Sequence, residues 1–189
     1  MSSQKTNAPF KLPQESQVEI TQLMLPNYSN FSGKIFGGHI LSLMDEVAFT
    51  CASKHSGKYC VTASVDKVDF RCPIEVGELV TMKARVNYVG RSSMVVGIRV
   101  EAENIRTGEI KHCNSSYFTM VAIEDGKPAL VPGLILQCSD NVRRFLRSAE
   151  RMRSTRLRRS TYGNKSTENF LKEEFLERLK EYNVKLDLH

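Results

Sequence analysis

Asp45 is the acidic side chain whose surroundings best suit acid–base chemistry. It lies in a segment that starts at Gly37, where positions 41, 44, 48 and 52 are Leu, Met, Ala and Ala. A carboxylate among apolar neighbours loses hydration, which makes it a stronger base. We therefore predict that Asp45 is a partly buried general base. The alternative is a surface position beside Glu46, with the side chain in solvent.

Gly37 and Gly38 open the same segment and offer a second chemical group. The first N–H groups of a helix have no partner within it and lie at the positive end of its dipole. Glycines let a ligand approach these groups closely, which suits a polarised carbonyl or a developing oxyanion. About two helical turns separate the pair from Asp45. A Gly–Gly pair is also common in turns without function.

Signatures of several other reaction classes are absent from the sequence. It has no G-x-S-x-G elbow, no H-E-x-x-H motif, no P-loop and no G-x-G-x-x-G motif. The four histidines lack metal-ligand spacing, and the five cysteines include no C-x-x-C pair. We therefore expect reduced thiols and no metal site. A carboxylate is the leading candidate for the general base.

One long helix and a series of strands must position these groups. From Gly37 to about Ser53 apolar residues, Leu41 and Met44 among them, recur at intervals of three and four, which predicts a largely buried helix. β-Branched and aromatic segments predict strands over residues 17–25, 61–70, 78–89, 93–104 and 110–123. This order predicts an α+β fold with an antiparallel sheet curled around the helix. An open sheet with the helix on a flat face is the alternative.

Composition divides the chain into three parts. Residues 1–16 are polar and without periodicity, which predicts a flexible N-terminal arm. Residues 17–132 hold the predicted domain. Residues 133–189 form a basic extension, with helices predicted over residues 141–158 and 167–182.

The excess positive charge lies in the C-terminal part. Residues 1–142 hold 14 basic and 14 acidic side chains, whereas residues 143–189 hold 13 and 7. A balanced body is typical of an enzyme that acts on small molecules rather than of a nucleic-acid-binding domain. The sequence shows no secretory signal and no apolar run long enough to span a membrane, so we expect a cytoplasmic protein.

Three ordered motifs give the chain a family resemblance. Residues 26–48 read P-N-Y-S-N-F-S-G-K-I-F-G-G-H-I-L-S-L-M-D-E-V-A, residues 61–70 read V-T-A-S-V-D-K-V-D-F, and residues 90–94 read G-R-S-S-M. They closely resemble the hotdog acyl-CoA thioesterases of the bacterial YciA type and the cytosolic mammalian acyl-CoA hydrolases. The resemblance covers residues 17–132. It implies a hotdog fold and hydrolysis of fatty acyl-CoA to a free fatty acid and CoA.

The resemblance also implies a shared catalytic site. Asn30, in N-x-x-G-x-x-F-G-G, and Asp45, in M-D-E, match the family's catalytic pair, with the Gly37 and Gly38 amides as oxyanion donors. The family places two sheets side by side, which implies a homodimer with Asn30 and Asp45 from different subunits. Trimers of such dimers are common in it. Asp45 would activate water or attack the carbonyl itself, and both remain open. No cofactor is implied.

Contacts to the CoA substrate are implied as well. The arginine of the G-R-S-S-M turn is expected to face a phosphate, its serines to donate hydrogen bonds, and one strand to run beside the pantetheine arm. A lysine after that strand is expected to face the charge of CoA. Arg91 is the arginine of this turn, and Ser92 and Ser93 are its serines. Val61, Thr62 and Ala63 form the strand beside the pantetheine arm, and Lys67 is the lysine after it. Apart from the resemblance, residues 90–94 are an ordinary Gly–Ser hairpin turn.

The chain departs from the family pattern before Asn30. Family members often read P-x-D-T-N, whereas Tyr28 and Ser29 stand at the Asp and Thr positions here. Asn30 and Asp45 are retained, so we expect activity to be retained. Substrate range and the order of the loop around Asn30 are what this departure affects.

Two other functions remain as alternatives. The first is a non-enzymatic hotdog regulator, in which the domain would sense acyl-CoA and the Arg-rich tail would bind nucleic acid. No helix-turn-helix pattern precedes the domain, so we expect no nucleic-acid partner. A hotdog enoyl-CoA hydratase or dehydratase would pair a histidine with an acid. His39 lies at the helix start rather than beside Asp45, so we expect it to be structural.

Overall fold

The computed structural model describes residues 9–162, with side chains up to residue 157. Its central element is helix α1 (Gly37–Ser56). One side of α1 is buried at intervals of three and four, as packing on a single face requires. The buried residues are Ile40, Met44, Val47, Ala48, Cys51, Ala52, His55 and Ser56. Gly57 ends the helix in the left-handed conformation, with φ 69°, which glycine adopts without steric cost.

Helix α1 differs from the prediction in two respects. It continues three residues past Ser53, to Ser56. Leu41, predicted on the buried side, is exposed, whereas Ile40 next to it is buried. The side of the helix that carries Leu41 also carries Asp45. This side therefore remains accessible from outside the single chain.

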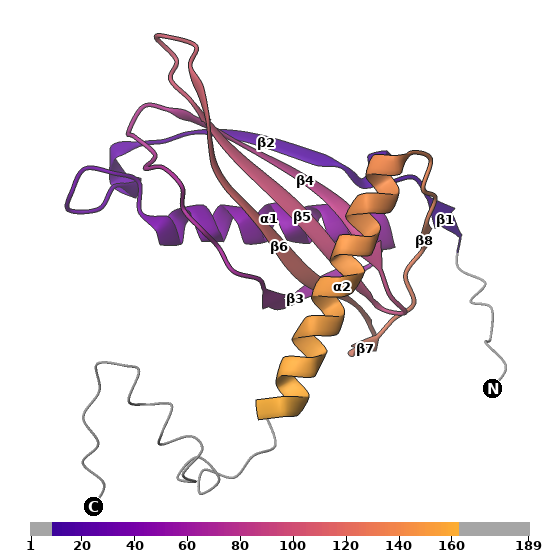
Figure 1. The fold of residues 1–189 in the computed structure, drawn as a ribbon. Helices are drawn as coiled ribbons and strands as arrows, with labels where there is room; N and C mark the ends of the chain where they lie inside the picture. The colour runs from indigo at the N-terminus through magenta and orange to yellow at the C-terminus, as the bar shows by residue number, and fades with distance from the viewer. Residues whose placement is uncertain (1–8, 163–189) are drawn as a thin grey trace, which may run out of the picture. The chain divides into compact units, whose positions relative to one another are not determined.

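An antiparallel sheet curls around α1, as Figure 1 shows. In spatial order its strands are β2 (Val18–Leu23), β4 (Leu79–Val89), β5 (Ser93–Glu103), β6 (Ile110–Glu124) and β3 (Tyr59–Val65). The short strand β7 (Lys127–Pro128) pairs with the end of β6. Strands β2 and β3 therefore form the two edges of the main sheet.

The core lies between α1 and the inner face of the sheet. Strands β4 and β5 alternate as predicted, and every second side chain is buried against the helix. The inward residues are Val80, Met82, Ala84 and Val86 on β4, Met94, Val96, Ile98, Val100 and Ala102 on β5, and Phe118, Met120 and Ala122 on β6. A curled antiparallel sheet around one central helix is the hotdog fold, which confirms the predicted fold class.

Two predicted strands have different bounds in the structure. Strand β3 begins two residues before the predicted segment 61–70 and ends five residues before its end. Residues 66–78 form a loop to β4 instead. The first strand, β2, is shorter than the predicted 17–25, because the backbone of Met24 turns to bond Glu78 and Gly77 at 2.9 and 2.8 Å.

Short elements surround the ends of α1. Strand β1 (Phe10–Lys11) pairs in parallel with β8 (Gly133–Leu134) and is followed by the 3-10 helix η1 (Pro13–Ser16). The Lys11 ammonium donates to the His55 carbonyl at 2.9 Å, which ties this segment to the end of α1. A second 3-10 helix, η2 (Pro26–Tyr28), precedes the start of α1.

Helix α2 (Ser139–Tyr162) confirms the basic helix predicted over residues 141–158. Its residues up to Ser148 belong to the same compact unit as the sheet, and the remainder belongs to a second unit. In the first unit the Phe145 ring packs on Tyr88 of β4, with centroids 5.0 Å apart. The helix predicted over residues 167–182 lies outside the described residues. No helix within residues 9–162 has the length and apolar character needed to cross a membrane.

Candidate active site

Asp45 lies on the side of α1 that faces strand β3. The Thr62 hydroxyl donates a hydrogen bond to Asp45 Oδ1 at 2.5 Å, the range of a strong bond to a carboxylate. Thr62 is held at this position by an irregularity in the β3–β6 pairing between Thr62 and Ser64. The sequence suggested Thr62 as a CoA contact, whereas in the structure it orients the candidate base.

The predicted partial burial of Asp45 is wrong for the single chain, in which Asp45 is exposed. Met44 points into the core, and the next residue along a helix is rotated by about 100°. The apolar neighbours in sequence therefore pack under the helix while Asp45 points away from them. Any further burial of this carboxylate must come from substrate or from another subunit.

Asp45 opens into a hollow between α1 and β3 with a volume of about 500 Å³. The helix contributes Asp45, Glu46, Phe49 and Thr50, and the strand contributes Tyr59, Cys60, Val61 and Thr62. The rings of Phe49 and Tyr59 meet edge to face, with centroids 5.6 Å apart. This hollow combines the oriented carboxylate of Asp45 with a second carboxylate, Glu46, and with the rings of Phe49 and Tyr59, which offer an acyl group an apolar surface.

Sequence reasoning missed Phe49 and Tyr59 as site residues. Phe49 follows Asp45 by one helical turn, so it lies on the same side of α1. Tyr59 is 64% exposed although it is aromatic and opens an edge strand. The four-residue spacing from Asp45 could have identified Phe49 from the sequence. No comparable pattern identifies Tyr59.

Gly37 and Gly38 form the first turn of α1, as predicted. Phe36, which precedes them, gives no side-chain cap, so the first amides of the helix remain available to a ligand. A Cβ atom on Gly38 would lie 2.4 Å from the Phe36 ring, whereas one on Gly37 would meet the Phe70 ring at an ordinary 3.4 Å. A side chain at position 38 would therefore require the exposed Phe36 ring to move aside.

One chain alone does not bring the helix start and the carboxylate together. Eight residues of α1 separate Gly37 from Asp45, which corresponds to about 12 Å along the helix axis. A thioester carbonyl cannot contact both groups over this distance. Within one chain, the Gly37 and Gly38 amides and the Asp45 carboxylate therefore cannot act on the same carbonyl.

Asn30 lies in the exposed turn before α1. Its Oδ1 accepts hydrogen bonds from the Ser32 amide at 3.0 Å, the Ser32 hydroxyl at 2.7 Å and the Lys34 amide at 3.2 Å. Gly33 takes a φ of 75° in the same turn, a conformation that favours glycine. With Oδ1 occupied, the Nδ2 group is the part of Asn30 that can donate to a ligand.

His39 lies in the first turn of α1, next to Gly38 and six residues before Asp45. Its ring stacks on Tyr28, with centroids 3.9 Å apart and planes inclined by 15°. Its buried Nε2 has no hydrogen-bond partner within the described part of the chain. The ring is therefore packed as a structural histidine would be, but its hydrogen-bonding capacity is not fully used. Tyr28 replaces an acidic residue common in the family and here serves as the stacking partner of His39.

The predicted CoA contacts lie at two places. Gly90 donates to the Ser93 carbonyl at 2.7 Å, which closes the β4–β5 hairpin that carries Arg91, Ser92 and Ser93. Through β6, the register sets Ser93 and Val61 on either side of Val121, so this hairpin and the β3 part of the hollow share one end of the sheet. Thr62 and Ala63 continue the exposed strand. Lys67 lies in the loop after β3, 3.0 Å from Asp69.

A second hollow, of about 300 Å³, lies on the outer face of the sheet. Its walls include Lys83, Arg85, Arg99 and Arg144 and none of the predicted site residues. None of the described carboxylates lines it, so it offers no acidic group comparable to Asp45 as a general base. Among the described residues no three His, Cys, Asp or Glu side chains are grouped to hold a metal ion.

Comparison with known proteins supports the fold and the chemistry. Residues 32–109 match the family described as the Thioesterase superfamily. Protein VdlD of Helicobacter pylori is 45% identical over 126 residues, which cover 67% of this chain and 72% of VdlD. A solved apo-hexameric acyl-CoA thioesterase is 35% identical, with a TM-score of 0.76, over 82% of this chain and 99% of that one.

An acyl-CoA hydrolase from Staphylococcus aureus, solved with butyryl coenzyme A, coenzyme A and coenzyme A disulfide, is 30% identical, with a TM-score of 0.75. The match covers 91% of this chain and 99% of that one. The same hydrolase has been solved with an asparagine, an aspartate or a threonine replaced by alanine, at positions separated by 15 and 17 residues. Asn30, Asp45 and Thr62 have the same spacing. The chain therefore belongs to the thioesterase superfamily, in which its relatives include acyl-CoA hydrolases.

Proposed function

We propose that this protein hydrolyses acyl-CoA thioesters to a free acid and CoA, with Asp45 as the reactive carboxylate. The observation that carries the proposal is the 2.5 Å hydrogen bond from Thr62, which orients Asp45 in a hollow that Phe49 and Tyr59 also line. The matching intervals of asparagine, aspartate and threonine in the Staphylococcus aureus hydrolase support it. A location in the cytoplasm remains a prediction from sequence.

The chemistry follows from the groups at hand. In one route Asp45 takes a proton from water, and the resulting hydroxide attacks the thioester carbonyl. The Gly37 and Gly38 amides of a second subunit stabilise the oxyanion, the carbon–sulfur bond breaks, and the CoA thiolate takes up a proton. In the other route Asp45 attacks first and the mixed anhydride is hydrolysed. Both routes require water, a carboxylate and amide donors, and no cofactor.

We further propose that the site is completed by a second subunit. Strand β3 pairs only with β6 and leaves its other edge open within the described residues. Exposed apolar side chains lie around this edge: Leu41, Phe49, Val61 and Val65. An open strand edge with an apolar surround is typical of an interface. Two copies joined along β3 would bury Asp45 and supply the partner subunit's Asn30.

A trimer of such dimers is the assembly we propose, since one similar solved thioesterase is hexameric. Within it, the hairpin of Arg91, Ser92 and Ser93 would bind CoA phosphate, while the exposed strand from Val61 to Ala63 would flank the pantetheine arm. Lys67 would contribute positive charge at the loop after β3. These residues are proposed contacts of the substrate rather than of a cofactor.

Release of free CoA thiol from an acyl-CoA, followed with a thiol reagent, tests the proposal. We expect Asp45→Asn to lose most of the rate, because the amide can neither accept a proton nor act as a nucleophile. Glu46→Gln is the matched control, because Glu46 is the adjacent carboxylate in the same hollow. Equal loss in both variants would contradict hydrolysis by Asp45, as would loss of water from a 3-hydroxyacyl-CoA to give a 2-enoyl-CoA without CoA release.

Mixing inactive Asn30→Ala and Asp45→Ala proteins tests the shared site. In a mixed dimer one site would combine the intact Asn30 of one subunit with the intact Asp45 of the other. We expect recovery of roughly a quarter of the native rate after subunit exchange, because half of the dimers are mixed and half of their sites are intact. Confirmed mixed dimers without recovery would exclude this geometry.

A further inference from the structure

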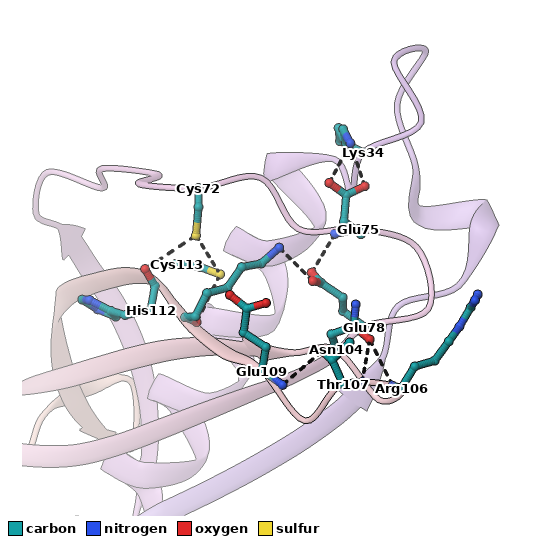
Figure 2. Close-up of polar contacts among 11 residues, drawn as sticks. Lys34, Cys72, Glu75, Glu78, Asn104, Arg106, Thr107, Glu109, His112 and Cys113 are labelled. Carbon is teal, nitrogen blue, oxygen red and sulfur yellow. Dashed lines mark hydrogen bonds and ion pairs between the residues drawn. The ribbon is translucent and has the colours of Figure 1, made fainter.

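The loop of residues 66–78 connects the sheet to both parts of the candidate site. On one side the Arg71 amide donates to the Cys113 carbonyl of β6 at 2.9 Å. On the other side the Ile35 amide donates to Ile74 at 2.9 Å, and Lys34 forms an ion pair with Glu75 at 2.6 Å. Figure 2 shows the Lys34–Glu75 contact and the cysteine contact described next. The loop therefore links β6 to the turn that carries Asn30.

The same loop covers the start of α1. Phe70 lies where a Cβ atom on Gly37 would meet its ring at 3.4 Å. A shift of this part of the loop would change the surroundings of the first helix amides. Both the proposed oxyanion donors and Asn30 thus depend on where this loop lies.

Two thiols meet where the loop crosses β6. The Sγ atom of Cys72 is 3.4 Å from the Sγ atom of Cys113, and both cysteines are free. A disulfide requires about 2.05 Å, so the sulfur atoms need to approach by only about 1.4 Å. The Cys72 thiol makes hydrogen-bond contacts with the Cys113 sulfur and the His112 carbonyl, and these contacts hold it in this orientation.

The two thiols differ in access. Cys72 is half-buried at the surface of the loop, whereas Cys113 is fully buried. Burial raises the pKa of Cys113 to about 12, so it stays protonated and reacts poorly with an oxidant from solution. Cys72 is therefore the thiol that an oxidant reaches first, and Cys113 is in place to react second.

We propose that Cys72 and Cys113 are an oxidation site at which a peroxide forms an intramolecular disulfide that fixes the loop of residues 66–78 to β6. The Cys72 thiolate attacks a peroxide oxygen and becomes a sulfenic acid, and the released hydroxide takes up a proton to form water. The Cys113 sulfur then attacks the Cys72 sulfur, and its proton leaves with the displaced hydroxyl as a second water. Two thiols lose two electrons and two protons, and the peroxide is reduced to two waters.

The disulfide has a consequence for activity that rests on the proposed function. Closing the sulfur–sulfur gap moves Cys72 toward β6 and carries Phe70, two residues away, relative to Gly37. Displacements near 1 Å at a catalytic centre lower rates by up to about 100-fold. We expect the oxidised protein to turn over acyl-CoA at least about 10-fold more slowly, with full recovery when the disulfide is reduced.

Mass spectrometry of the full-length protein treated with hydrogen peroxide tests the bond itself. We expect a peptide that joins Cys72 to Cys113, with two hydrogens fewer than the separate peptides, which disappears after treatment with a dithiol. Cys138→Ser should give the same product, because Cys138 is exposed and has no thiol neighbour among the described residues. Cys72→Ser should not. Sulfinic acid at Cys72 without a cross-link would overturn the proposal.

Activity before and after peroxide tests the coupling to the site. Native protein should lose turnover and regain it with dithiol, whereas Cys72→Ser should keep its turnover throughout. A complete disulfide with unchanged turnover would overturn the coupling. A reduced protein with no hydrolysis at all would contradict the proposed function, while the mass measurement would still decide whether the cross-link forms.

Discussion

The hydroxyl of Thr62 on β3 and the carboxylate of Asp45 on α1 are joined by a hydrogen bond of 2.5 Å, the only side-chain hydrogen bond that this carboxylate makes within residues 9–162. The bond connects an edge strand to the central helix. Because the Asp45 side chain is otherwise exposed, Thr62 determines which oxygen faces the hollow. The neighbouring oxygen is then left for water or for a thioester carbonyl.

Thr62→Val should lower kcat by roughly 10- to 100-fold. A hydrogen bond to a charged group contributes about 1.5–3 kcal/mol, and each 1.4 kcal/mol corresponds to a factor of ten in rate. Thr62→Ser should retain most of the activity, because it keeps the hydroxyl. Thr21→Val is the matched control, since Thr21 bonds Thr81 on the opposite edge of the sheet. Steady-state kinetics on one acyl-CoA distinguish these cases, and equal rates for Thr62→Val and Thr21→Val would contradict the assigned role.

Gly38→Ala should impair catalysis more than Gly37→Ala. The new methyl group at position 38 would lie 2.4 Å from the Phe36 ring, so this exposed ring must move beside the first helix amides, whereas the methyl group at position 37 meets Phe70 at 3.4 Å. We expect kcat to fall about 10-fold or more for Gly38→Ala, because misplaced oxyanion donors lose transition-state stabilisation. Circular dichroism should show both variants folded. The opposite ranking of the two variants would argue against an oxyanion role for this turn.

Val65→Lys should weaken assembly and activity together. Val65 is an exposed apolar residue on the open strand β3, and burying a lysine charge at an interface is unfavourable. Ile105→Lys is the matched control, because Ile105 is also exposed and apolar but lies in the turn between β5 and β6. Analytical ultracentrifugation should show smaller species for Val65→Lys alone. An unchanged sedimentation profile would place the interface elsewhere.

His55 should make the folding stability depend on pH. Its Nε2 contacts the Pro132 carbonyl at 3.0 Å and its Nδ1 contacts the Ser16 hydroxyl at 3.2 Å, so the neutral ring with a proton on Nε2 fits this site. Burial lowers the pKa of His55 below its ordinary value of 6.5. The unfolded chain therefore binds the proton more readily, and stability present above pH 6.5 is lost as the pH falls below it.

Urea unfolding between pH 5 and pH 8 measures this dependence. The slope for one proton is at most about 1.4 kcal/mol per pH unit. His55→Gln should flatten the loss of stability at acidic pH, whereas His112→Gln, at a half-buried position on β6, should leave it in place. A native protein whose unfolding free energy is the same at pH 5.5 and pH 7.5 would rule out the buried neutral ring.

The fold was predictable from the sequence because its periodicities are local. Apolar alternation in β4 and β5 and the three-to-four spacing in α1 depend only on neighbouring residues. The bounds of β3 were less predictable. Val68 and Phe70 have strand propensity, yet the backbone leaves the sheet after Val65 because residues 66–78 must cross to reach β4. Such a crossing is decided by tertiary contacts that no local pattern contains.

The site was predictable in its residue types but not in its geometry. The Gly37–Gly38 turn and Asp45 were identified from spacing, and the family resemblance added Asn30. The exposure of Asp45 was missed because Leu41 and Met44 appear equivalent in sequence, although only Met44 faces the core. The Thr62 bond and the proximity of Cys72 to Cys113 join residues 17 and 41 positions apart, which only a folded chain reveals.

The length of α1 makes each subunit contribute to both reaction centres of the proposed dimer. The helix amides and the Asp45 carboxylate of one chain are about 12 Å apart and would belong to different reaction centres. A subunit lacking both Asn30 and Asp45 would therefore inactivate both sites of any dimer that contains it. When such doubly altered chains are mixed with native protein and subunits exchange, the remaining activity should fall as the square of the fraction of native chains. If each chain acted independently, the activity would fall in proportion to that fraction.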